Sequence, residues 1–141
     1  MRVDFIVRGE AVGKERPRVF GRHAVTPEKT KLYEAQVGWE YARAAKKAGA
    51  VDFLKPPLAV SITAFHVPPK SWSKVKRFAH FGAPWEGVPD ADNICKAILD
   101  GLQGVAFQND SSVTYAEISK RYVQSDGEEA HVRVSIWEVT E

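Results

Sequence analysis

Apolar and small side chains recur every three or four positions between residues 94 and 102, directly after the acidic tetrapeptide Pro89-Asp90-Ala91-Asp92. The positions with this spacing are Ile94, Ala97, Ile98, Gly101 and Leu102. Because an α-helix completes a turn every 3.6 residues, the spacing predicts a helix that buries one stripe of its surface. The rest of the chain must therefore supply the core on which this helix packs.

Polar groups gather on the opposite side of the predicted helix, where Asp92, Asn93, Lys96 and Asp100 fall at about 100° per residue. Asp92 is suited to N-cap the helix. In an extended segment Asp90 and Asp92 leave the same side of the backbone, and two adjacent carboxylates are costly unless one protonates or a cation lies between them. The pair predicts a metal site or, alternatively, a capped helix with a solvated Asp–Lys pair.

Composition indicates one soluble globular domain over residues 1–141, with 44% apolar and 27% charged residues. There is no apolar run long enough to span a membrane and no signal-peptide pattern, so a cytoplasmic protein is expected. The single cysteine, Cys95, excludes a disulfide framework and a thiolate zinc cluster, and it is expected to be a half-buried packing residue. The histidines lack zinc-ligand spacing and are expected at the periphery; they are His23, His66, His80 and His131.

Charge is distributed unevenly along the chain. Residues 1–80 hold 16 Lys or Arg against 7 Asp or Glu, whereas residues 81–141 hold 4 against 11, so the two parts carry +9 and −7. A basic part beside an acidic part suits a protein that binds phosphates with one surface and cations with another. Alternatively, the two parts interleave in the fold and the asymmetry cancels in space.

Cations cluster in three places that suit phosphate binding. If residues 14–18 are extended, as Pro17 favours, Lys14, Arg16 and Arg18 point the same way and form a row of phosphate contacts; a solvated basic loop is the alternative. The other cations expected to bind DNA are Lys29, at the start of a helix, and Lys74, Lys76 and Arg77, in a short helix.

The remaining patterns predict a mixed sheet with two main helices. Alternation and β-branched residues predict strands at 2–8, 58–65, 113–123 and 131–139, the last two forming a hairpin around residues 125–128. Helical periodicity predicts a helix from the Thr26 N-cap to Ala48, stopped by Gly49. Its apolar side is expected to include Tyr33, Val37, Tyr41, Ala44 and Ala48, widened by Trp39 and Ala42. A short helix from Trp72 to about Phe81 is expected to be capped by Ser71.

Asp110 precedes the strand at 113–123, close to where the 91–102 helix should return. It is therefore a candidate third carboxylate beside Asp90 and Asp92. Oxygen ligands of this kind suit a hard cation such as Mg²⁺.

Four segments together resemble the RusA family of Holliday junction resolvases. They are Gly13-Lys14-Glu15-Arg16-Pro17-Arg18, Thr26-Pro27-Glu28-Lys29-Thr30 with Tyr33-Glu34, Pro69-Lys70-Ser71-Trp72-Ser73-Lys74, and the run from Pro89 to Leu102 with Asn109-Asp110. The last resembles the family's active-site segment in order and spacing. Two departures are Asn109, where family members often have a second Asp, and Val88, where a basic residue often precedes the Pro-Asp step.

The resemblance implies that Asp90, Asp92 and Asp110 bind Mg²⁺, with one or two ions per subunit, and that Lys96 assists catalysis. Asn93 and Asp100 match recurrent family positions and are expected to support the site. The implied fold is α/β, a mixed sheet with helices packed on it, in a homodimer. The expected activity is Mg²⁺-dependent cutting of four-way DNA junctions by paired symmetric nicks. The alternatives are a nuclease acting on flaps or single strands and a non-catalytic DNA-binding protein.

Overall fold

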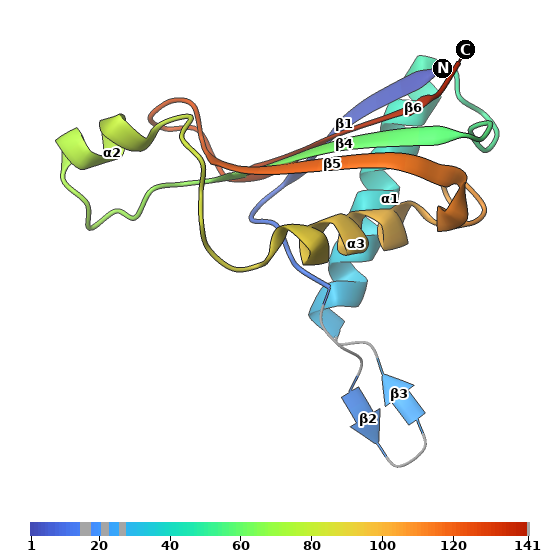
Figure 1. Ribbon diagram of the computed structural model, residues 1–141, viewed down its shortest axis with the longest axis horizontal. Coiled ribbons are helices and arrows are strands. Elements are labelled where there is room, and N and C mark those ends of the chain that lie inside the picture. The colour runs from blue at the N-terminus through green and yellow to red at the C-terminus, as the bar shows by residue number, and fades with distance from the viewer. Residues whose placement is uncertain (15–17, 21–22, 26–27, 141) are drawn as a thin grey trace.

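A computed structural model describes the backbone of residues 1–14, 18–20, 23–25 and 28–140, and the side chains of residues 1–14 and 28–140. Figure 1 shows the elements in space. The strands are β1 (Arg2–Arg8), β2 (Arg18–Phe20), β3 (His23–Val25), β4 (Leu58–His66), β5 (Val113–Tyr122) and β6 (His131–Glu138). The helices are α1 (Glu28–Ala48), α2 (Lys74–His80) and α3 (Ala91–Leu102), with a 3₁₀ turn at Asp110–Ser112.

Four strands form a mixed sheet in the order β1-β6-β4-β5, and β2 pairs with β3 in a separate antiparallel ribbon. Helices α1 and α3 lie on one face of the sheet, and α2 lies at the end away from the two termini (Figure 1). The expected α/β fold with a mixed sheet is confirmed. Among the helices of the described residues, none combines the length and apolar character needed to cross a bilayer.

The predicted terminal hairpin is wrong, although both of its strands exist. β5 pairs in parallel with β4, and β6 pairs antiparallel with β4 and β1, so β4 separates the two strands. Alternation specifies which face of a strand is buried but not which strand lies beside it. Because β5 is an edge strand, the middle of the strand is exposed, including Ala116.

Pairing between β4 and β5 contains one irregularity, which lies near the start of β5. Leu58 is opposite Val113, but Ala59 is opposite Tyr115, so Thr114 is an extra residue in β5. Such a bulge bends the strand and leaves one residue outside the regular ladder. From Ala59 onward the register runs unbroken to the end of both strands.

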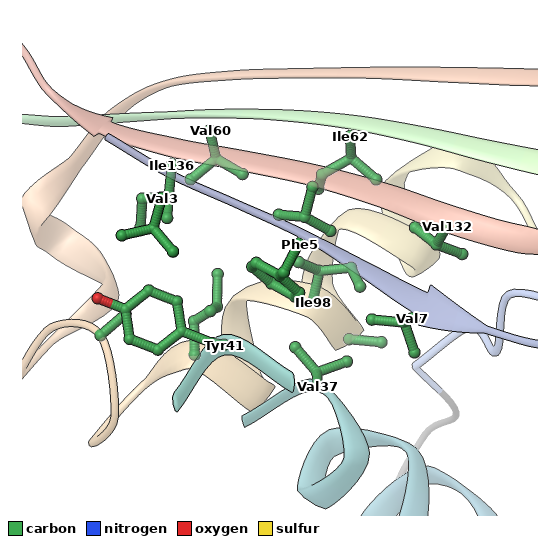
Figure 2. Packing of buried hydrophobic residues seen from close by; sticks show 14 of the residues in the cluster. Val3, Phe5, Val7, Val37, Tyr41, Val60, Ile62, Ile98, Val132 and Ile136 are labelled. Atoms are coloured by element: carbon green, nitrogen blue, oxygen red, sulfur yellow. The ribbon is translucent and has the colours of Figure 1, made fainter. Parts of the chain in front are cut away.

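The core lies between the sheet and the two long helices (Figure 2). Alternate residues of β1, β4 and β6 meet one side of α1 and the apolar stripe of α3, whose five predicted positions are all buried. Side chains from five elements meet there; examples are Phe5, Tyr41, Ile62, Ile98 and Ile136. The period-2 and period-3.6 patterns therefore identified the core faces correctly.

Local details differ from the predictions in several places. Trp39 is 64% exposed instead of widening the apolar side of α1, and Ala42 and Ala48 are exposed as well. Helix α2 begins at Lys74, with the Ser73 hydroxyl accepting from the Lys76 amide, so Ser71 is not its cap. His66 is 3% exposed and is therefore not peripheral. The predicted Thr26 cap lies outside the described residues.

Two glycines allow α1 and α3 to approach closely. A Cβ atom on Gly101 would lie 2.7 Å from the Val37 Cβ and 2.9 Å from the Glu34 carbonyl oxygen, and one on Gly38 would lie 3.0 Å from the Gly101 carbonyl oxygen. These glycines bring the buried stripe of α3 close to α1, so the Asp100 side chain next to Gly101 lies near the same part of the fold as Glu34 of α1.

Substituting Gly101 by Ala is expected to destabilise the protein despite the higher helix propensity of Ala. Propensity would contribute about 1 kcal/mol in favour, but the new methyl group meets backbone and a β-branched carbon, and such overpacking costs about 1–3 kcal/mol. Urea unfolding should show a net loss for Gly101→Ala and a smaller one for Gly38→Ala. An increase in stability for Gly101→Ala would contradict the close packing of the two helices.

Candidate active site

The N-terminus of α3 places two of the predicted carboxylates. Asp90 occupies the N-cap position with φ −67° and ψ 154°, and the helix begins at Ala91. Asp92, predicted as the cap, instead lies in the first turn, and the Asp90 side chain forms no capping hydrogen bond. Both residues are exposed. A carboxylate in the first turn is favourable because the helix N-terminus carries partial positive charge.

A chain of ion pairs runs along the polar face of α3. Lys96 Nζ lies 3.1 Å from Asp100 Oδ1 and 3.3 Å from Asp110 Oδ2. Lys14 Nζ lies 3.1 Å from the other oxygen, Asp100 Oδ2, and 2.6 Å from Glu34 Oε1. Asp100 is thus shared by two lysines. The network joins residues 9–14, which follow β1 and are called the N-terminal arm below, to α1, α3 and the turn before β5.

These contacts favour the charged form of both lysines. Hydrogen bonding to Asp100 is the main reason that the pKa of Lys96 lies above its ordinary value; partial burial opposes it, and the bond to Asp110 reinforces it. For Lys14 the largest single influence is partial burial, which lowers the pKa. Hydrogen bonds to Glu34 and Asp100 outweigh that influence, so the pKa of Lys14 is raised.

The N-terminal arm is fastened to the start of α3 by its backbone. The Lys14 amide donates to the Asn93 carbonyl oxygen at 2.9 Å. A Cβ atom on Gly13 would lie 2.6 Å from the Pro89 Cβ, so only glycine fits without a shift. Asn93 therefore anchors the arm through its backbone carbonyl group. This contact is the supporting role that the structure shows for Asn93.

Asp110 reaches the helix from the 3₁₀ turn that precedes β5. The Asn109 side chain caps this turn by accepting from the Ser111 amide at 3.1 Å. The Asp110 amide donates to Gln103 Oε1 at 3.4 Å, a second link to the end of α3. Asn109 stands where the family pattern often has an acidic residue. Its role here is to cap the turn that carries Asp110.

The structure brings Lys96, Asp100 and Asp110 together, and it places Asp90 and Asp92 at the N-terminal end of the same helix. Within the part of the chain that the structure describes, neither Asp90 nor Asp92 has a side-chain hydrogen bond or ion pair, and no three acidic, histidine or cysteine side chains converge as a metal-binding group. Sequence reasoning missed Gln103 and gave Glu34 no role, because both act through contacts between distant elements.

The predicted DNA-binding residues differ in their surroundings. Lys29, Lys74 and Lys76 are exposed, and Lys76 Nζ lies 4.1 Å from the centre of the Trp72 ring. Arg77 pairs with Asp126 at 3.0 Å, and Lys14 is bound to its two carboxylates. Arg16 lies outside the described residues, and the structure gives only the backbone of Arg18.

Cys95 is half-buried beside the site, as expected. Burial, reinforced by the charge of Asp92, raises the pKa of its thiol, and Lys96 opposes this only in part. Thiol reagents should therefore modify native Cys95 more slowly at pH 8 than they modify the same cysteine in urea, because the thiolate is the reactive form. A native rate equal to that of the unfolded chain would contradict this environment.

Comparison with known proteins decides the family. The model of the endodeoxyribonuclease RusA family matches residues 8–136. The chain belongs to the RusA family. It is also 31% identical over 146 residues to the uncharacterized protein YqaN of Bacillus subtilis strain 168, with 98% of this chain and 97% of that protein covered.

RusA membership makes the chain a nuclease of the Holliday junction resolvase class, with junction DNA as the implied substrate. Nucleases of the RusA type generally depend on a divalent metal ion. The match covers nearly the whole chain, including the N-terminal arm, α3 and the turn that carries Asp110.

Proposed function

We propose that this RusA-family chain resolves four-way DNA junctions by two symmetric, Mg²⁺-dependent nicks, with Asp90, Asp92, Lys96 and Asp110 as its catalytic residues. The observation that carries the proposal is the meeting of Lys96, Asp100 and Asp110 on the polar face of α3. A cation held among carboxylates on an exposed helix face suits the charge of a phosphodiester.

The proposed metal ligands are the carboxylates of Asp90, Asp92 and Asp110. Their oxygen donors match the preference of Mg²⁺, which proteins usually hold through one or two carboxylates while water and substrate phosphates complete its coordination. Exposure of Asp90 and Asp92 leaves room for those other ligands. When bound, the ion supplies positive charge for the phosphate oxygens and positions the reactants.

Lys96 is proposed to contact the scissile phosphate. Its ammonium carries a full charge and is 52% exposed, so a phosphate oxygen can approach it. Its bonds to Asp100 and Asp110 orient the side chain, and its pKa lies above the ordinary value, which keeps it protonated. Lys96 would thereby stabilise negative charge that develops on the phosphate. Asp100 is proposed to support the site by orienting Lys96.

DNA is proposed to bind the site together with the basic residues of other elements. Lys29, Lys74 and Lys76 expose their charges, and Arg16, Arg18 and Arg77 retain the role that the sequence predicts. Lys14 is assigned to DNA binding from the sequence, and the structure adds that it is bound to Glu34 and Asp100. Phosphate contacts of this kind position the duplex and weaken as salt rises.

Two symmetric nicks require two active sites, and the proposed catalytic residues of one chain make up one site. A two-fold homodimer is the simplest arrangement that supplies both. Sedimentation at the concentration used for cleavage should therefore give twice the mass of one chain. A monomer that still made paired nicks would contradict this part of the proposal.

The deciding experiment compares a synthetic four-way junction with a linear duplex of matched sequence and with a flap substrate, each over a range of Mg²⁺ concentrations. The expected result is paired nicks in the junction that need Mg²⁺. Preference for flaps or single strands would replace the proposal by the other nuclease activity. Junction binding without cleavage under any divalent ion would reject catalysis.

A further inference from the structure

The segment between α2 and α3 runs along the edge of the sheet before it reaches Asp90. The Gly82 amide donates to the Val123 carbonyl oxygen at 3.0 Å, and the Trp85 amide donates to the Lys120 carbonyl oxygen at 2.9 Å. In the opposite direction, the Tyr122 amide donates to the Ala83 carbonyl oxygen at 2.9 Å. Residues 82–85 therefore act as a short added strand that covers the last part of β5.

The Trp85 side chain contacts His66, at the end of β4, and Lys120 of β5. Its ring stacks on the imidazole of buried His66, with 3.5 Å between ring centres and 11° between planes. A Cβ atom on Gly87 would lie 2.5 Å from the same ring, so the chain can turn back against Trp85 only because residue 87 is glycine. Lys120 Nζ lies 5.1 Å from the ring centre, close enough for a cation–π contact.

Lys120 closes this arrangement just before the proposed metal ligand. Its ammonium donates to the Gly87 carbonyl oxygen at 2.5 Å and to the Pro89 carbonyl oxygen at 3.1 Å. The Pro89 carbonyl belongs to the peptide unit that also contains the Asp90 nitrogen, and a peptide unit is planar. By fixing that plane, Lys120 limits the backbone orientation from which the Asp90 side chain projects.

We propose that Lys120 is a positioning residue for Asp90, acting through the Gly87 and Pro89 carbonyl groups. The inference rests on the proposed function, because it assumes that Asp90 binds the metal. Two of the three ammonium donors bind carbonyl oxygens, and the group also lies over Trp85. This lysine therefore differs from the exposed lysines of α2, whose charges are available to DNA.

The test compares Lys120→Met, which keeps the aliphatic stem but removes the donors, with Lys47→Met, which removes an exposed lysine from the last turn of α1. Three quantities are measured for each: amide hydrogen exchange over residues 86–91, the Mg²⁺ concentration for half-maximal junction nicking, and junction affinity without metal. Loss of residues that orient metal ligands typically weakens metal affinity by about 10–100-fold.

In Lys120→Met the amide hydrogens of residues 86–91 should exchange faster than in the parent. Half-maximal nicking should need at least about tenfold more Mg²⁺, and junction affinity without metal should stay within about twofold of the parent. Lys47→Met should match the parent throughout. Gly87→Ala provides a second variant: its methyl group pushes on Trp85 while Lys120 stays in place, and the Mg²⁺ requirement should rise again.

Parallel measurement of Asp90→Asn separates the two hypotheses. If Asp90→Asn abolishes nicking but Lys120→Met keeps the parental Mg²⁺ requirement, positioning by Lys120 is rejected and the proposed function stands. Unchanged amide exchange in Lys120→Met would also reject it. If Asp90→Asn nicks normally, the proposed role of Asp90 fails and the inference about Lys120 fails with it.

Discussion

Replacing Asp92 by Asn should slow junction nicking by roughly 10²–10³-fold, because one charged metal ligand is lost from the site. Asn has nearly the same shape, and Asp92 is exposed, so no packing changes. The lost carboxylate stood in the first turn of α3, where its interaction with the helix dipole is worth about 0.3–1 kcal/mol. The variant should therefore fold and bind junctions while failing to cut them.

Single-turnover cleavage and junction binding should be measured together for Asp92→Asn. Asp52→Asn is a suitable control, since Asp52 is an exposed carboxylate in the loop after α1. The proposal predicts a slow rate for Asp92→Asn at every Mg²⁺ concentration and parental behaviour for the control. Full nicking activity in Asp92→Asn would remove it from the catalytic set.

Replacing Lys96 by Met should lower the nicking rate by roughly 10²-fold, the usual effect of removing one group that stabilises developing charge. Lys96→Arg should recover only part of this, because a planar guanidinium cannot take the place of a compact ammonium between Asp100 and Asp110. Stability should change by only about 0.3–0.5 kcal/mol, as expected for an exposed pair spaced i, i+4. Lys47→Met is the matched control.

The pH dependence gives a separate check on Lys96. A raised lysine pKa means that the charge is complete below the ordinary value of about 10.4 and is lost only as pH rises through the higher folded value. Nicking rates between pH 6 and 9 should therefore show no loss from deprotonation of Lys96. Asp100→Asn removes the main cause of the shift, so the Lys96 pKa measured by NMR should fall. An unchanged value would contradict the assigned contact.

Periodicity in the sequence was enough to find the elements but not their neighbours. The alternation of β1 and β6 and the stripe of α3 predicted which side chains would be buried. Whether β6 would pair with β5 or lie between β1 and β4 depends on contacts across the whole domain, which local alternation does not encode. The hairpin was the natural expectation for consecutive strands, and the structure replaces it with a crossover.

The candidate site shows the same division between local and distant information. Spacing alone placed Asp92, Lys96 and Asp100 on the polar face of α3 and predicted a pair between Asp92 and Lys96, whereas Lys96 pairs with Asp100 one turn further along. The bond between Lys14 and Asp100 could not be predicted, because it requires the N-terminal arm to dock on α3 across the fold. For that reason the sequence predicted Lys14 as a phosphate contact and not as part of an ion pair.

The pairing of β5 with β4 limits changes of chain length near Asp110. Residues 115–122 are held in register by β4, so an insertion or deletion between Asp110 and Tyr115 must be absorbed either in the bulge at Thr114 or by moving Asp110. One strand residue spans about 3.3 Å, as much as the 3.3 Å separation of the Lys96 and Asp110 side chains. A change in length that moved Asp110 by one strand residue would therefore break its contact with Lys96.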